Sequence, residues 1–239
     1  MKRKLSSISL TLALLLALVL PAHPGQAFAA ASITKSGLPT RTDKDILAQW
    51  NKLMVPSEAD REPFVTEPSV AAPYSPGSLD AQYIQDGVNA VNFYRFISGL
   101  PYDVTSAGDL NVLAQYGSVL LAAEGEFSHT PAKPDDMPKD FYAKGYKSTS
   151  SANIYASYGY DDHIVVRSID AYMEDSDTNN LDRLGHRRWI LNPALKKVAS
   201  DWPRARMNGF IPPCKSSIRV DPRPWIITSS PIPLKDRFR

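Results

Sequence analysis

The feature that most constrains the fold is a series of helix-length segments, each bounded by its own start and stop signals. In the first, over residues 78–98, apolar side chains recur at helical spacing, at Tyr83, Ile84, Val88, Val91, Tyr94 and Ile97. Ser78 is expected to cap the first turn, and Gly99 followed by Pro101 provides the usual end of a helix. This pattern predicts a helix with one buried face.

Two later segments repeat the same format. The second starts with Ser106 as its expected cap, and its apolar face includes Ala114 and Gly117, which are small enough to let a helix or a sheet approach closely. The third is predicted from about Asp161 to Glu174. Cys214 is the only cysteine, so no intrachain disulfide can form, and stability must come from packing or from a metal.

The first 31 residues have the layout of a secretory signal peptide. Residues 2–4 are basic, an apolar run covers about residues 9–20, and Ala27-Phe28-Ala29 offers a cleavage site for a signal peptidase. The run is shorter than the roughly 20 residues that cross a bilayer. We therefore expect a cleaved signal instead of an uncleaved anchor helix. The mature protein would be secreted, extracellular or attached to the cell envelope, with no transmembrane span.

Residues 32–77 are expected to form a Pro-rich N-terminal extension with one short helix. That helix is predicted around Asp43–Met54, where apolar residues again follow helical spacing. The prolines that follow disfavour helix and predict an extended strap that lies along the domain or links to it. Binding of a partner by this extension is a further hypothesis.

Charge separates the C-terminal end from the remainder of the chain. Residues 32–198 hold 16 Lys and Arg against 22 Asp and Glu, a net charge of −6, whereas residues 199–239 carry a net charge of +5. A modestly acidic domain lacks the basic face of a nucleic-acid binder. We therefore expect no nucleic-acid partner.

Three histidines follow the predicted signal peptide: His129, His163 and His186. His163 lies beside two aspartates at the start of the third helix, and a solvated surface role is expected for it. The other two occupy loops next to helix ends, where functional residues concentrate. His129 and His186 are therefore the candidate site residues.

Four stretches of this chain carry a resemblance to a known family. "VNFYRFISGLP", "AQYGSVLLAAEGEFSHTP", "ANIYASYG" and "YMEDSDTNNLDRLGHRRWILNP" follow one another as in the CAP superfamily. That superfamily includes cysteine-rich secretory proteins, antigen 5 and pathogenesis-related proteins, together with secreted bacterial members that lack disulfides. The similarity covers about residues 86–198 and rests on the order and spacing of the four pieces, because each alone is weak.

The resemblance implies an α+β fold, a CAP-type α-β-α sandwich over residues 78–198, with two histidines and two acids in a cleft. His129 and His186 match the histidines. The family's first glutamate corresponds to Ala152, so that acid is missing here. The second acid corresponds to Asp175, with Glu174 as the adjacent alternative.

Two functions from different classes follow from this set of residues. The first is a binding module for a small ligand, lipid or cell-wall component, favoured because one acid is lost and no nucleophile stands out. The second is a metal-dependent hydrolase of peptide or wall substrates. In it, His129, His186 and Asp175 would ligate zinc, since three protein ligands form the open pattern of catalytic sites. Asp175 could equally serve only to orient His186.

A calcium-binding loop is the other metal reading of the segment that begins at Asp175. The sequence "DSDTNNLD" imitates the start of such a loop, but Asn180 replaces the required glycine and His186 stands where a bidentate glutamate belongs. A polar loop whose side chains bond their own backbone is the favoured interpretation.

The pattern changes abruptly after Val198. The family continues there with a glycine-rich core strand of the form "GIGLA", whereas this chain reads "ASDWP" and then holds seven prolines between Pro203 and Pro233. The codons GTC GGC ATC GGA CTG GCC encode Val-Gly-Ile-Gly-Leu-Ala, and loss of one G yields Val-Ala-Ser-Asp-Trp-Pro. We therefore hypothesise that residues 199–239 are an out-of-frame tail, with the C-terminal core strands missing or scrambled. A genuine basic extension that binds anionic wall polymers is the alternative.

Overall fold

The structure is a computed structural model that describes residues 37–54, 62–125, 127–157, 163–178, 180–202 and 214–220. The predicted signal peptide lies outside these residues. The helices are α1 (Asp43–Leu53), α2 (Ala81–Ile97), α3 (Gly108–Glu124), α4 (Lys139–Thr149), α5 (Ile164–Glu174) and α6 (Arg187–Ile190). The strands are β1 (Phe64–Thr66), β2 (Ser78–Leu79), β3 (Thr105–Ser106), β4 (Asn153–Ser157), β5 (Lys197–Ser200) and β6 (Cys214–Val220).

A four-stranded mixed sheet lies at the centre, with strand order β3-β5-β6-β4. β3 runs parallel to β5, and the β5–β6 and β6–β4 pairs are antiparallel. β1 and β2 form a separate antiparallel pair. The mixed α+β class predicted from the sequence is therefore confirmed.

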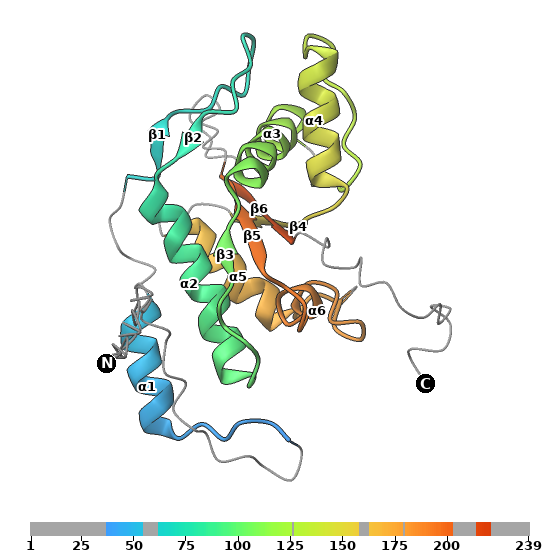
Figure 1. Ribbon diagram of the computed structural model, residues 1–239. Coiled ribbons are helices and arrows are strands. Elements are labelled where there is room, and N and C mark those ends of the chain that lie inside the picture. Colours follow the sequence, from blue (N-terminus) through green and yellow to red (C-terminus); the bar gives the residue numbers. More distant parts are fainter. Residues whose placement is uncertain are drawn as a thin grey trace, which may run out of the picture.

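Helices cover both faces of this sheet (Figure 1). Successive residues of β5 show the two faces, because side chains alternate along a strand. Val198 belongs to the core cluster that includes α2 and α5, whereas Ala199 packs with Ala114 of α3. Val198, Ala199 and Ser200 are therefore buried although they point to alternate faces, and only Lys197 at the start of β5 is exposed.

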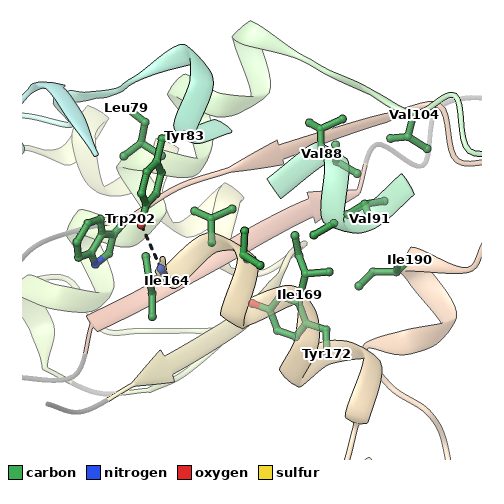
Figure 2. Packing of buried hydrophobic residues seen from close by; sticks show 14 of the residues in the cluster. Leu79, Tyr83, Val88, Val91, Val104, Ile164, Ile169, Tyr172, Ile190 and Trp202 are labelled. Carbon is green, nitrogen blue, oxygen red and sulfur yellow. Dashed lines mark hydrogen bonds between the residues drawn. The ribbon is translucent and has the colours of Figure 1, made fainter. Parts of the chain in front are cut away.

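The main core joins α2, α5 and the sheet (Figure 2). Val88, Val91, Ile169 and Tyr172 are nearly inaccessible to solvent there. The Tyr83 hydroxyl accepts a hydrogen bond from the Ile164 backbone N–H at 3.1 Å. This bond satisfies one of the amides at the start of α5 that have no partner within the helix.

The predicted small residues of α3 do admit close neighbours. A Cβ on Gly117 would lie 2.6 Å from the Ser148 hydroxyl of α4, and one on Gly145 would lie 2.9 Å from Leu120. α4 packs along α3 through these contacts. α4 itself was not predicted from the sequence.

The helix ends were predicted better than the helix starts. Gly99 adopts φ 73° just after α2, as the glycine stop requires. The predicted serine caps are wrong. Asp80 caps α2 by accepting from the N–H groups of Gln82 and Tyr83, and the N-cap residue of α3 is Ala107, which has no side chain that could cap it.

The end of the Pro-rich extension packs onto the domain. Phe64 of β1 is buried in the same core cluster as Tyr83, although it precedes the predicted domain start at residue 78. α1 matches the predicted helix and contacts α2, where the rings of Trp50 and Phe93 meet edge to face at 5.2 Å between centroids. The fold unit therefore begins before residue 78.

The segment after Val198 contributes strands to the sheet, whereas the sequence analysis expected the C-terminal core strands to be missing or scrambled. Ala199 and Ser200 complete β5, and residues 214–220 form β6, so both inner strands of the sheet use residues that were predicted to be aberrant. Trp202 is only 5% exposed and stacks on Phe64 at 5.3 Å between ring centroids. The expectation that core strands are missing is wrong for these described residues. Its out-of-frame explanation stays a prediction about the gene.

Candidate functional site

His129 and His186 line the same cleft, which has two adjoining lobes. The first lobe measures about 520 Å³ and is also bordered by Arg183, Arg188 and Trp189; we call it the arginine lobe. The second measures about 490 Å³ and is also bordered by Phe127, Tyr155, Tyr172, Glu174 and Asp177; we call it the acidic lobe. Both histidines and Asn180 line both lobes. The two imidazoles that the sequence singled out are thus brought together.

Asp175 holds His186 on one side of this cleft. Its Oδ1 lies 2.8 Å from the His186 Nδ1, and its Oδ2 accepts hydrogen bonds from the backbone N–H groups of His186 and Arg187, each at 3.1 Å. The Asp175 side chain is fully buried, while that of His186 is 19% exposed. A carboxylate only accepts hydrogen bonds, so the proton between them sits on Nδ1.

The two helices next to Asp175 cap each other. Asp175 ends α5 in the left-handed conformation at φ 50°, which an aspartate tolerates better than most residues. Its carboxylate caps the start of α6. In return, the Arg187 guanidinium donates to the backbone carbonyls of Met173 and Glu174 at the end of α5, at 2.5 and 2.6 Å. This exchange fixes the direction of the His186 ring.

His129 is held in an equivalent way by α4. Its Nδ1 lies 2.8 Å from the backbone carbonyl of Thr149, the last residue of that helix, and the Thr149 hydroxyl donates back to the His129 carbonyl at 3.1 Å. A carbonyl also only accepts, so His129 carries its proton on Nδ1. In both histidines, Nε2 is then the ring nitrogen left to accept a hydrogen bond or to bind a metal.

The loop between α5 and α6 contributes Asn180 to the lining of both lobes. The Asn180 side-chain amide donates to Asp177 at 2.8 Å. A Cβ on Gly185 would collide with the Asn180 side-chain oxygen. The absence of a side chain at Gly185 therefore leaves room for the Asn180 amide within the cleft.

The two other positions that the sequence analysis singled out, Glu174 and Ala152, line different lobes of the cleft. Glu174, the alternative acid, lines the acidic lobe and is exposed. Ala152, the position at which the resemblance implied a glutamate, lines the arginine lobe. An acid at that position would therefore face the same space as the two histidines.

The predicted zinc set of His129, His186 and Asp175 does not come together as three close ligand atoms. Among the described residues, Asp175, Asp177 and His186 are the group whose ligand atoms all lie within 4.8 Å of one another. Both oxygens of Asp175 already accept hydrogen bonds from His186 and Arg187. Binding a metal would require Asp175 to give up at least one of these hydrogen bonds. Asp175 is therefore better suited to orient His186 than to ligate a metal.

Two further residues support the geometry of the cleft, and no sequence pattern pointed to either: Arg95, which is not among the residues that line the two lobes, and Asn153, which lines the arginine lobe. The buried Arg95 guanidinium donates to the backbone carbonyls of Ile190 and Asn192, each at 2.8 Å, and so holds the end of α6. Burial lowers the pKa of Arg95. The Asn153 amide donates to the His186 carbonyl at 3.3 Å.

The predicted surface role of His163 is wrong. His163 as a whole is only 2% exposed. Its ring stacks on Tyr83 at 3.8 Å between centroids, and its Nε2 lies 3.2 Å from the buried Asp86 carboxylate. Its Nδ1 accepts the Val166 N–H and caps α5. Its neighbours in sequence suggested solvent, but its partners come from α2.

Comparisons with known proteins add no relative: none of the protein-family models, curated proteins or solved structures compared with this chain matches it. In the part of the chain that the structure describes, no helix is both long enough and apolar enough to cross a bilayer. The site defines the molecule as a mixed α+β protein whose cleft presents two oriented imidazoles.

Proposed function

We propose that this chain is a secreted CAP-type protein. Its cleft would use His129 and His186 to bind one extracellular partner, which is a small ligand, a lipid or a cell-wall component. The observation that carries the proposal is that both imidazoles line both lobes of one cleft, each with Nδ1 bound to the protein. Two donors or acceptors held in fixed directions can orient a bound molecule, as the few polar groups of a ligand site do.

The lining of the cleft favours binding over covalent catalysis. The Ser151 hydroxyl donates to the Lys147 carbonyl at 2.7 Å, and the Ser150 hydroxyl donates to the same carbonyl at 3.5 Å. Neither is hydrogen-bonded to an imidazole in a way that would activate a nucleophile. Ala152 also leaves the arginine lobe without the acid that the resemblance implies at this position, so the described lining of that lobe offers no carboxylate for acid–base chemistry.

A zinc-dependent hydrolase is the second candidate, and one observation favours it. Histidines that ligate a metal usually donate their other ring N–H to a carboxylate or a carbonyl. His186 does so to Asp175, and His129 does so to Thr149. The Nε2 atoms of the two rings would hold zinc, which would polarise a bound carbonyl. Among the described residues, no carboxylate forms a close group with both histidines to serve as the third protein ligand of the open pattern.

Sedimentation with defined surfaces tests the binding proposal. The protein is mixed either with insoluble peptidoglycan or with phosphatidylglycerol vesicles, and the bound fraction is measured for the unmodified chain, His129→Ala and His186→Ala. We expect one of the two surfaces to retain the chain and both variants to lose most of that retention. Lys44→Glu, which changes an exposed residue of α1, serves as the control.

Retention that survives both histidine changes would contradict the proposal, and so would the absence of binding both to these two surfaces and to the soluble peptides described in the next subsection. Zinc titration by calorimetry separates the two candidates. Stoichiometric zinc binding that both histidine changes abolish, together with hydrolysis of peptidoglycan, would favour the hydrolase.

A further inference from the structure

We propose that the cleft binds an extended peptide segment that places an acidic group in the arginine lobe and a basic side chain in the acidic lobe, with its backbone across the two histidines. This inference rests on the proposed function and specifies the chemical class of its ligand. It follows from the opposite charges of the two lobes, which adjoin at His129, Asn180 and His186.

The arginine lobe suits a carboxylate. Arg183 and Arg188 are the charged side chains other than histidine that line it, and no acid borders it among the described residues. The Arg188 guanidinium lies 5.3 Å from the centre of the Trp189 ring. A guanidinium presents a planar set of donors that matches a carboxylate, so an acidic group gains charge-assisted hydrogen bonds here.

The acidic lobe suits a long basic side chain. Glu174 and Asp177 line it, and none of its described lining residues is a lysine or an arginine. Its lining includes Phe127 and Tyr155, which are accessible to solvent, and the nearly buried Tyr172. Lysine and arginine have apolar stems and charged ends. The stem can therefore lie along the aromatic side chains while the charged end reaches the carboxylates.

The groups between the lobes suit a peptide backbone. Because Nδ1 carries the proton in both histidines, each Nε2 is an acceptor that can take a backbone N–H. Asn180, whose amide fits beside Gly185, adds a group that can both donate and accept. An extended backbone alternates N–H and C=O groups, so it matches such a set better than a lipid chain does.

Blocked synthetic peptides test the proposal. Acetyl-Lys-(Ala)n-Glu-amide peptides with n from 0 to 3, in this order and in reverse, are titrated into the full chain by calorimetry at low ionic strength. We expect one spacing and order to bind best. Replacing its Glu by Gln, or its Lys by norleucine, should weaken binding threefold to tenfold, and added salt should weaken it further.

Charge reversal in the protein assigns each end of the peptide to a lobe. Arg188→Glu should remove the protein's preference for a peptide with Glu over one with Gln, while its preference for Lys over norleucine stays. Glu174→Lys should remove the preference for Lys over norleucine, while the preference for Glu over Gln stays. Lys44→Glu, far from the cleft on α1, should change neither preference. The two cleft substitutions change exposed side chains, so the fold is expected to remain intact.

Several results would overturn the inference. They are equal binding of charged and neutral peptides, no binding of any peptide at millimolar concentration, or binding to phosphatidylglycerol vesicles in place of peptides. If peptidoglycan or vesicles retain the chain in a histidine-dependent way while the peptides fail, the proposed function stands and only the peptide inference falls. If the peptide affinity is unchanged in both His129→Ala and His186→Ala, the proposed function itself fails.

Discussion

Replacing Asp175 by Asn is predicted to reverse the tautomer of His186 while the chain still folds. Asn has nearly the same shape as Asp and tolerates the left-handed conformation found at φ 50°. The two backbone N–H groups of His186 and Arg187 point at the Oδ2 position. The amide oxygen must therefore take that position, which places the amide NH₂ against the His186 Nδ1.

The consequence for the imidazole is a transfer of its proton. An NH₂ group only donates, so Nδ1 has to become the acceptor and Nε2 has to carry the hydrogen. Nε2 then faces the cleft as a donor and can no longer accept a hydrogen bond or bind a metal. Binding that depends on the His186 Nε2 should be lost even though the ring stays in place.

The cost in stability follows from the same three hydrogen bonds. Bonds to a charged group contribute about 1.5–3 kcal/mol and neutral ones about 0.5–1.5 kcal/mol. Three bonds that change from charged to neutral therefore cost about 3 kcal/mol in the free energy of unfolding. Chemical denaturation measures this loss, which most domains survive.

Nitrogen NMR of the imidazole rings measures the tautomer directly, with each histidine assigned through its His→Gln variant. We expect Nδ1 to be the protonated nitrogen of His186 in the unmodified chain and Nε2 to be protonated in Asp175→Asn. Asp177→Asn removes an equal charge from the same loop and should leave the tautomer unchanged. An identical His186 tautomer in all three proteins would refute the orienting role of Asp175.

Three other perturbations probe the core and the cleft. Trp202→Ala should lower the free energy of unfolding by about 3–5 kcal/mol, because it deletes a buried aromatic side chain, while Trp189→Ala, at a partly exposed position, should have a much smaller effect. Arg95→Met should cost about 3 kcal/mol, since it leaves the carbonyls at the end of α6 without their donor. Ala152→Glu should raise zinc affinity at least tenfold in calorimetry, because it adds an acid to the lobe that both histidines line; Lys44→Glu, which places an acid on α1 and lines neither lobe, is its control.

Each of these has a clear contrary result. Equal unfolding midpoints for Trp202→Ala and the unmodified chain would show that the segment after Val198 does not pack into the core. Unchanged stability in Arg95→Met would remove the support assigned to α6. Equal zinc affinity with and without Ala152→Glu would show that this position does not face the metal-binding space.

The helices were predictable because their signals are local. The apolar stripe of α2 and the glycine exit at Gly99 operate within a few residues. The structure reproduces the glycine exit and buries Tyr83, Val88 and Val91 of the stripe, but it leaves Ile97 exposed. The helix starts were harder to predict, because the two expected cap residues belong to strands that pair with other parts of the chain. Ser78 cannot cap α2 because it belongs to β2 opposite Thr66, and Ser106 pairs in β3 with Val198.

The same limit applies to the site. The motifs placed both histidines at helix ends, and both line the cleft. The Thr149 carbonyl that holds His129 had no sequence signal, because a backbone acceptor carries no residue identity. His163 shows the opposite error: two adjacent aspartates suggested solvent, whereas its partner Asp86 lies 77 residues away in sequence.

The segment after Val198 shows what composition cannot decide. Its prolines and basic charge predicted a tail without core strands. Main-chain pairing needs only free N–H and C=O groups, however, and a short run such as residues 214–220 can supply them. Trp202 then fills the space between Phe64 and Tyr83.

The convergence of the two imidazoles is tested most directly by thiol cross-linking. His129→Cys and His186→Cys are combined in a chain whose single native thiol is removed by Cys214→Ser, and a short bis-maleimide is added at low protein concentration. We predict that mass spectrometry finds the two loops joined within one chain, whereas the pair His129→Cys and Lys44→Cys stays unjoined. Single modification of both cleft thiols, with no link between them, would contradict a shared cleft.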